Sequence, residues 1–464
     1  MPNRIVVATA ETLGPRMAGP AIRSVAIARC LAGEGFDVEI VSTGGVLLDD
    51  PMARHVDEQG LRDAFDRADA IIFQGYVLLG APWAMRTDKP LVVDLYDPIH
   101  LEAIEQTRSM GDDTWWAWTN NALDVLAGQT RRGDFFLCAS ERQRALWIGH
   151  LGAEGRVNPI SYTDDPTLRR LIDVAPFGIA EEPPVRTGPG VRGVIPGIGD
   201  DDKVVLWGGG IYEWFDPLTL VSAIDGLRHR VPDVRLVFMG VTHPNPMVPE
   251  MAVVAETRAL SERLGLTGRH VFFNEQWIPY DERQNVLLDA DVAVTTHKEH
   301  IETTFSFRTR VLDYIWASRP IVTTAGDVLA DIVAADGLGL VVPPGDVHAL
   351  ETALFRLLTD ESLSAACRAA IEDARHRFSW TSALAPLVRF CESPHRAPDL
   401  VDPARKHHRA LGDAVRPEGV AGRLRYDTRL ARKYLSEGGV TNVVRRASGR
   451  ARRALGGGQG PTSR

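Results

Sequence analysis

The sequence predicts an α/β protein with two doubly wound parallel sheets that face a cleft, followed by a basic carboxyl-terminal extension. Short apolar runs alternate with segments of helical spacing along most of the chain. This alternation is typical of parallel sheets covered by helices. A stretch rich in Pro and Gly interrupts the series once, and the alternation then starts again. Two series separated by a linker indicate two domains.

The first series opens with a βαβ unit. We expect a strand at residues 4–10, a loop at 11–20, a helix at 21–33 and a second strand at 36–41. Further strands are expected at residues 70–75, 90–97 and 134–140. These elements assign residues 1–172 to an N-terminal Rossmann-like domain. Gly19, in the loop before the first helix, could let the backbone approach a ligand closely.

The linker is expected at residues 173–200, and a second Rossmann-like domain at residues 201–380. Its expected strands are 203–207, 234–240, 270–274, 292–295 and 320–324, with a helix starting near residue 217 and another between the last two strands. Residues 381–397 have helical spacing, and we expect them to cross back toward the first domain. Residues 398–464 form the basic tail, expected to be partly helical or disordered.

The composition is that of a globular protein without a membrane span. The chain has 464 residues, of which 44% are hydrophobic and 24% charged. No run of 18 uncharged apolar residues occurs, and the start of the chain lacks the apolar core of a signal peptide. We therefore expect a cytoplasmic protein. The four cysteines lack metal-site spacing, so we expect neither a metal nor a disulfide framework.

Charge is distributed unevenly along the chain. The net charge is -9, yet the tail from Val401 carries 15 Lys and Arg against 5 Asp and Glu. An acidic body argues against nucleic acid as a partner. Within residues 422–455 apolar and basic residues alternate, which suits helices lying on an anionic membrane at its inner face. The alternative is a solvated, disordered tail.

Polar side chains collect where the strands of the second domain end. In an open α/β sheet, ligands bind at the carboxyl ends of the strands. After the strands expected at 292–295 and 320–324 come side chains suited to a phosphorylated sugar compound: His297, Glu299, Glu302, Ser306, Arg308, Arg310, Gly326 and Asp327. The sequence therefore predicts a ligand site at this edge.

Several segments in this order resemble the GT-B glycosyltransferases, and most closely their family 4. The telling pieces are VVLWGGGIYEWFDPLTLVSAI, RLVFMG, WIPYDERQNVLLDADVAV, FSFRTRVLDYIWASRPIV and the pair Gly326-Asp327. The similarity covers roughly residues 4–395. It implies transfer of a sugar, with retention of configuration, from a nucleotide-diphosphate sugar in the second domain to a glycan or lipid-linked acceptor entering from the first, in polysaccharide or glycolipid biosynthesis. It also implies no metal and no cofactor.

At the donor site, only some of the family's residues have a counterpart in this sequence. The stretch DYIWASRPIV gives Asp313 the role of gripping the ribose. The family's first acid, eight residues earlier, would fall on Phe305. Either Glu302 serves as the catalytic acid across a longer loop, or this chain dispenses with it. A further alternative is that Glu302 only solvates the loop.

The family's Arg and Lys after the first strand of the second domain are missing here. Gly208, Gly209 and Gly210 stand in their place, where backbone N–H groups could approach a phosphate. The charge would come from Arg308 first and then Arg310. Their loop also contributes Ser306 and Thr309.

On the acceptor side, Tyr96 stands where the family often has a His. Asp97 and His100 lie close by and are the candidates for an acceptor-side catalytic role. Trp115, Trp116 and Trp118 form an aromatic cluster that could meet an acceptor or could simply pack between helices.

Two other functions fit the same architecture. One is a nucleotide-sugar epimerase. The other is a non-catalytic scaffold that binds a nucleotide sugar unchanged, as the missing first acid would allow. Turnover of the donor separates them, because transfer requires an acceptor and epimerisation does not.

Overall fold

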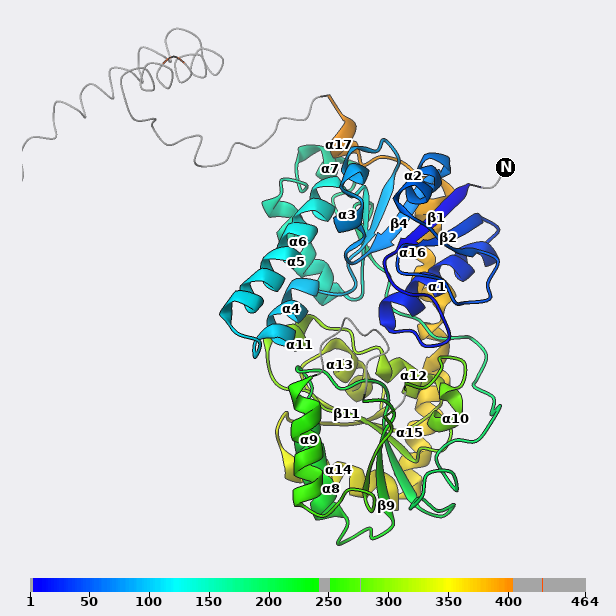
Figure 1. The fold of residues 1–464 in the computed structure, drawn as a ribbon, viewed down its shortest axis with the longest axis vertical. Helices are drawn as coiled ribbons and strands as arrows, with labels where there is room; N and C mark the ends of the chain where they lie inside the picture. The colour runs from blue at the N-terminus through cyan, green and yellow to red at the C-terminus, as the bar shows by residue number, and fades with distance from the viewer. Residues whose placement is uncertain (1–2, 242–250, 276, 404–427, 429–464) are drawn as a thin grey trace, which may run out of the picture. The chain divides into compact units, whose positions relative to one another are not determined.

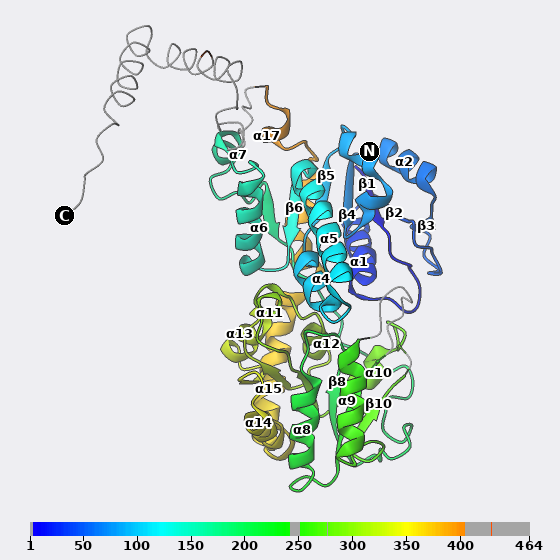
Figure 2. The ribbon, with the colours of Figure 1, turned by 60° about the vertical axis from the view of Figure 1, so that its left-hand side comes forward.

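Two parallel sheets organise the protein. The structure, a computed structural model, describes residues 3–241, 251–275, 277–403 and 428. Both sheets belong to one compact unit, residues 1–405. Figure 1 and Figure 2 show the first half in blue to cyan and the second half in green to yellow. Of the basic tail, residues 398–403 and 428 are described; residues 404–427 and 429–464 lie outside the described residues.

The first sheet has the strand order β3-β2-β1-β4-β5-β6-β7, and all of its ladders are parallel. Its strands are β1 (Arg4–Thr9), β2 (Asp37–Ser42), β3 (Ala53–His55), β4 (Ala70–Gln74), β5 (Leu91–Asp94), β6 (Phe135–Cys138) and β7 (Ile172–Val174). The helices of this half are α1 (Gly19–Gly33), α2 (Glu58–Arg67), α3 (Val77–Gly80), η1 (Pro82–Arg86), α4 (Ile99–Thr107), α5 (Asp112–Arg132), α6 (Glu141–Ala153) and α7 (Pro159–Asp164).

The second sheet has the order β10-β9-β8-β11-β12-β13 and is also parallel. Its strands are β8 (Lys203–Trp207), β9 (Val234–Phe238), β10 (Val271–Phe273), β11 (Val292–Thr295), β12 (Ile321–Thr324) and β13 (Gly339–Val342). The helices of this half are α8 (Pro217–Leu227), α9 (Ala252–Arg263), α10 (Arg283–Leu287), α11 (Ile301–Phe305), α12 (Arg310–Trp316), α13 (Val328–Ala335), α14 (Val347–Thr359), α15 (Glu361–Ala374) and η2 (Arg375–Phe378).

In each sheet the strand order reverses beside the first strand of the half. Strand β1 lies between β2 and β4, and β8 lies between β9 and β11. Ligands of open α/β sheets bind at such a switch point, outside the carboxyl ends of the strands. The turns after β1, β4, β8 and β11 are therefore the places to look for a site.

The chain passes between the halves at two adjacent points. The N–H of Ile179 donates to the carbonyl of Phe378 at 2.8 Å, and the N–H of Trp380 donates to the carbonyl of Ile179 at 3.1 Å. Gly178 lies so close to the second crossing that a Cβ there would be 2.7 Å from the Trp380 Cα. The forward and return connections are therefore joined like two neighbouring strands.

The end of the described chain returns to the first half. Helix α16 (Trp380–Glu392) packs on α1, and its last turns join the apolar core there (Figure 1). The short helix α17 (Pro398–Val401) packs on α7. Asp399 in α17 forms a buried ion pair with Arg156, with its Oδ2 2.7 Å from the Arg156 Nε. The crossing-back helix was predicted at residues 381–397; in the structure α16 ends at Glu392.

The α/β fold class predicted from the sequence is confirmed, with differences in detail. Strand β7 includes Asp173 and Val174, so the first sheet extends into the expected linker. The helix expected between the strands at 292–295 and 320–324 is two short helices, α11 and α12, separated by the loop that carries Arg308. Strands β3 and β13 are short and were not among the expected strands. Among the described residues, no helix combines the length and apolar character needed to cross a bilayer.

Candidate functional site

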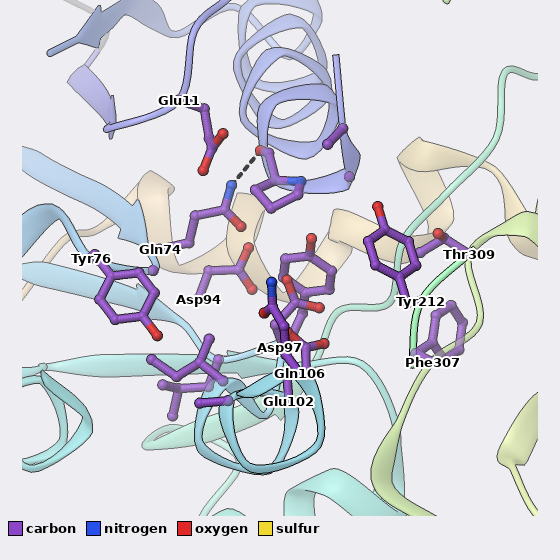
Figure 3. A pocket seen from close by; sticks show the side chains of 18 of the residues that line it. Glu11, Gln74, Tyr76, Asp94, Asp97, Glu102, Gln106, Tyr212, Phe307 and Thr309 are labelled. Carbon is purple, nitrogen blue, oxygen red and sulfur yellow. Dashed lines mark hydrogen bonds between the residues drawn. The ribbon is translucent and has the colours of Figure 1, made fainter. Parts of the chain in front are cut away.

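A pocket of about 450 Å³ lies between the two halves, at the carboxyl ends of both sheets. The turns after β1, β4 and β5, the start of α1, and helices α4 and α5 line it from the first half; the turn after β8 and the loop before α12 line it from the second. Figure 3 shows side chains from both halves around this space. The side chains that line the pocket include Glu11, Gln74, Asp94, Asp97, Glu102, Gln106, Trp118, Tyr212, Phe215, Arg308, Thr309 and Arg310.

Polar side chains lie at the ends of strands β1, β4 and β5 of the first half. Glu11 follows β1, Gln74 ends β4, and Asp94 ends β5. Gln74 is only 7% exposed; its Nε2 donates to Ser24 Oγ at 2.9 Å and to the Pro20 carbonyl, which holds the turn that begins α1. The Gln74 Oε1 is buried without a hydrogen-bond partner.

Asp94 is neutralised by its own counter-ion. Arg23, buried in α1, donates from Nε to Asp94 Oδ2 at 2.5 Å and from its second nitrogen to Oδ1 at 3.0 Å. The remaining donors of Arg23 reach the carbonyls of Ala175 and Pro176. The guanidinium also lies over the Tyr96 ring. This pair is fully used in the scaffold, so Arg23 brings no free charge to the pocket.

Three other carboxyl groups of the first half are not paired in this way. Burial raises the pKa of Asp97 to about 7, although a hydrogen bond from Tyr96 opposes it and nearby Asp94 adds to it. Burial raises the pKa of Glu102 well above its usual 4.5, and Asp97 and Glu302 contribute. Burial also raises the pKa of Glu11. Burial thus shifts the pKa of each of these three carboxyls upward, toward the neutral form.

Glu302, the predicted first acid, is fully buried and does not line the pocket. Its two oxygens accept from the two terminal nitrogens of Arg308 at 2.8 and 2.6 Å. Phe305, which takes the position of the family's first acid, accepts a hydrogen bond at its carbonyl from Gln143 of α6. Arg308 does line the pocket, but its two terminal nitrogens form an ion pair with Glu302.

Arg310 is the pocket cation without a carboxylate partner among the described residues. One terminal nitrogen donates to the Gly210 carbonyl at 2.6 Å, and the other is buried without a partner. The guanidinium lies 4.0 Å from the Phe215 ring centroid and 4.7 Å from that of Trp207. Burial lowers the pKa of Arg310 to about 10. A buried guanidinium that still has a donor to offer is a candidate for binding an anion.

The predicted glycine turn follows β8, but its N–H groups are not all free. Gly208 donates its N–H to the Tyr314 hydroxyl at 2.8 Å, and a Cβ at this position would collide with the Tyr314 ring. Gly209 has a φ of +89°, which favours glycine. The carbonyl of Gly210 holds Arg310. The turn therefore positions an arginine in addition to exposing backbone.

The remaining predicted donor residues surround the same loop. Thr309 directly precedes α12 and lines the pocket. Ser306 is buried, with its Oγ donating to the Thr303 carbonyl at 3.1 Å. Asp313, the predicted ribose ligand, accepts from Arg283 Nε at 3.0 Å and keeps about a third of its side chain exposed. Thr309 is the member of this set that the structure brings to the pocket, while Ser306 and Asp313 lie outside its lining.

Other strand-end residues of the second half are part of the scaffold. His297 and Asp327 are buried, with the His297 Nε2 3.2 Å from Asp327 Oδ2. Asp327 also caps α13 by accepting from the Ala330 N–H. Glu299 is exposed. Asp327 Oδ2 also lies 3.9 Å from Arg308 Nε, and none of these three residues lines the pocket.

Of the two acceptor-side candidates, Asp97 lines the pocket and His100 does not. His100 packs against Trp147, and burial lowers its pKa to about 4. Among the tryptophans, Trp118 lines the pocket and is 40% exposed, while Trp116 is 65% exposed. Trp115 instead bonds to α4 through its indole N–H.

Sequence reasoning did not single out Gln74 or Glu102, and it treated Glu11 only as the edge of a loop. The signal for Glu11 and Gln74 was present, because each lies at the end of a strand next to the switch point. Glu102 gave no such signal, because it reaches the pocket from the first turns of α4. Within the described ranges, no group of three or more His, Cys, Asp or Glu residues could hold a metal ion.

Comparisons with known proteins agree with this architecture. Residues 202–360 match the family model described as glycosyl transferases group 1. No curated protein matches the sequence. Similar solved structures include the sucrose-phosphate synthase of Thermosynechococcus elongatus, with a TM-score of 0.57 and 15% identity over 84% of this chain and 98% of that one.

Two further structures extend this likeness. The Anabaena protein HepE in complex with UDP-glucose has a TM-score of 0.58 and 13% identity, over 84% of this chain and 100% of that one. WaaG, a glycosyltransferase involved in lipopolysaccharide biosynthesis, has a TM-score of 0.58 and 17% identity over the same shares. At these identities the likeness shows the fold. The chain therefore shares the GT-B fold of these structures, and its residues 202–360 match the model of the glycosyl transferases group 1 family.

Proposed function

We propose that the protein transfers a sugar from a nucleotide-diphosphate sugar to a hydroxyl group of a glycan or lipid-linked acceptor, with retention of configuration and without a metal. The observation that carries this proposal is the pocket between the halves, which has an unpaired guanidinium at one side and carboxyl groups at the other. The family match of the second half and the UDP-glucose bound to HepE support a nucleotide sugar as the donor.

The donor's diphosphate would lie against Arg310 and the glycine turn. When the bond between the anomeric carbon and the diphosphate oxygen breaks, negative charge grows on the leaving group, and a preorganised guanidinium stabilises it. Arg308 is held by Glu302 and adds positive potential, although its hydrogen bonds are mostly used. This geometry favours Arg310 over Arg308 as the direct phosphate ligand.

The acceptor would enter along the first half, beside Asp97 and Glu102. In the proposed reaction the acceptor oxygen bonds to the anomeric carbon on the face that the diphosphate leaves, and the hydroxyl proton passes to the departing diphosphate. Carboxyl groups near this point stabilise the positive charge that develops on the sugar. Asp313, on α12, would be reached by the ribose of the nucleotide, beyond the lining of the pocket.

Thermal unfolding of the purified protein with a panel of nucleoside diphosphates and nucleotide sugars tests this proposal. Selective binding to the folded state raises the melting temperature. We expect a shift with one base, unchanged by a chelator, and slow hydrolysis or transfer of the matching sugar with its anomeric configuration kept, as read by NMR. Release of an inverted sugar would overturn retention. No shift with any nucleotide would overturn the donor assignment.

A further inference from the structure

The two sides of the pocket carry opposite charge. On the second-half side, Glu302 neutralises Arg308, which leaves Arg310 as the excess cation. On the first-half side, Arg23 neutralises Asp94, which leaves Glu11, Asp97 and Glu102 as the excess acids. Figure 3 shows these three acids on elements of the first half around the same space.

None of the three acids forms an ion pair with a cation of the described residues. The charges that act on Asp97 are those of Asp94, Glu302 and Arg23, and Tyr96 donates a hydrogen bond to it. Glu102 is affected by Asp97 and Glu302 and, in the opposite sense, by Arg308. Three partly buried carboxyls without a matching cation make a costly arrangement.

Gln74 provides a second observation that also indicates a ligand. This side chain is 93% buried and lines the same pocket, and its Oε1 has no hydrogen-bond partner in the described part of the chain. Its Nε2 is used to hold the Pro20 carbonyl and Ser24, so the amide is oriented with its oxygen as the group left over. A buried carbonyl oxygen without a donor is normally satisfied by a ligand or a water.

All of these groups can accept hydrogen bonds and therefore favour a ligand that donates them. Glu11, Asp97 and Glu102 in their charged form, and the Gln74 oxygen in any form, accept hydrogen bonds. A protonated amine brings three N–H donors and a positive charge, which a hydroxyl group does not. The rest of the lining suits a sugar ring, because it includes the aromatic side chains of Trp118 and Tyr212 and the amide of Gln106.

We propose that the acceptor is a carbohydrate that carries a protonated amine, held by Glu11, Asp97 and Glu102 with Gln74. This inference rests on the proposed function, since it places the acceptor in the first half of the pocket. The ammonium would replace the missing counter-ion of the acids, while the opposite charge on the second half keeps the diphosphate at the other side.

The closing experiment compares two disaccharides that differ only at position 2 of each ring. The β-1,4-linked disaccharide of glucosamine carries amines there, and cellobiose carries hydroxyls; ethanolamine supplies an amine without a ring. Binding is measured by titration calorimetry at about pH 6, where the amines of the disaccharide are protonated, to wild type, Glu102→Gln and Glu105→Gln. Glu105 is on the same helix but outside the pocket lining, so its variant makes the same substitution away from the pocket and serves as a control.

We expect the glucosamine disaccharide to bind about tenfold or more tightly than cellobiose, as charge-assisted hydrogen bonds require. Glu102→Gln should remove most of this preference, and Glu105→Gln should keep it. Because an ammonium favours ionised carboxyls, binding to wild type should also release protons, detected as a heat that depends on the ionisation enthalpy of the buffer. Cellobiose should release none.

Three outcomes would overturn the inference: equal affinity for the two disaccharides or binding of neither, a preference that survives Glu102→Gln, or ethanolamine binding as tightly as the disaccharide. Thermal shifts with UDP and UDP-glucose, measured on wild type in parallel, keep the two proposals separate. Nucleotide binding without a preference for the amine would reject the amine-bearing acceptor and leave the proposed donor site standing. A preference for the amine with no nucleotide shift would reject the donor assignment.

Discussion

Glu302 and Arg308 form a bidentate ion pair in which both side chains are buried, with oxygen–nitrogen distances of 2.8 and 2.6 Å. The pair fixes the loop between α11 and α12, from which Thr309 and Arg310 reach the pocket. Glu302 was expected to act on the sugar. In this structure it instead holds the loop between α11 and α12 in place through Arg308.

We expect the stability of the protein to depend on both partners of this ion pair together. Loss of one partner of a buried ion pair costs about 3–5 kcal/mol, because the remaining charge is left uncompensated. Glu302→Ala and Arg308→Ala should each destabilise by that order, and the double variant by clearly less than their sum. Denaturant unfolding in a double-mutant cycle measures this coupling. The exposed pair Glu58–Arg62 on α2 is the control, with a coupling of about 0–1 kcal/mol.

The nucleotide is expected to depend on Arg310. Arg310→Ala should weaken binding of the preferred nucleoside diphosphate by about 1.5–3 kcal/mol, as for loss of a hydrogen bond to a charged group. Titration calorimetry measures this change, with the exposed Arg356→Ala on α14 as a control that removes the same charge from the same half. Wild-type affinity in Arg310→Ala would place the diphosphate elsewhere. Arg308→Ala should also weaken binding by a few kcal/mol at most, through the loop that it supports.

Stability is expected to depend on pH through Glu102. The pKa of this group is raised in the folded protein, mainly by burial. As the pH rises above about 4.5, the unfolded chain releases this proton before the folded protein does, so stability is lost with rising pH. Glu102→Gln removes the loss. Its melting temperature should equal that of wild type near pH 4 and exceed it by a few degrees near pH 8; a gain that is the same at both pH values would contradict this account.

Gly178 should be essential for the paired crossings. A Cβ there would lie 2.7 Å from the Trp380 Cα, so Gly178→Ala must push the two connections apart. We expect a loss of about 1–3 kcal/mol, typical of overpacking, in thermal or denaturant unfolding. Gly149, inside α6, has open space around the added methyl, so Gly149→Ala should instead stabilise by about 0.5–1 kcal/mol. Equal effects at the two positions would show that packing at Gly178 is not the cause.

The basic tail gives a test that is independent of the pocket. If residues 422–455 bind an anionic membrane surface, a chain that ends after Pro403 should lose association with vesicles rich in phosphatidylserine. It retains Asp399 and its pair with Arg156, so the folded body should keep its melting temperature and its nucleotide affinity. Sedimentation of vesicles measures the loss. Equal sedimentation with and without the tail would favour the solvated tail.

Much of the fold followed from the sequence because hydrophobic alternation reports strands directly. The buried runs of β1, β4, β8 and β11 are almost wholly apolar, and the pocket lies at the carboxyl ends of their two sheets. Most of the residues predicted at the ends of β11 and β12 lie outside its lining. The crossing of α16 was also predictable from its helical spacing. Strand β3 could not be predicted, because its three residues Ala-Arg-His carry no apolar pattern.

The interior of the site was harder to predict, because pairing between distant residues decides which charges remain free. Nothing in the spacing of Arg23 and Asp94 shows that they neutralise each other across 71 positions. Likewise, Arg308 and Arg310 look equivalent in sequence, and only the Glu302 contact distinguishes them. Sequence locates the candidates, and three-dimensional packing determines which of them have donors or acceptors to offer.

The neighbouring chain crossings at Ile179 and Ser379 also limit how the halves can move. Because both connections run side by side and are hydrogen-bonded, they behave as one hinge and not as two separate tethers. A rotation about that hinge can widen the pocket on the side away from it without stretching either connection. Substrate entry and product release would then share one route, on the side where no peptide joins the halves, and the order in which donor and acceptor bind becomes a question of which half each one reaches first.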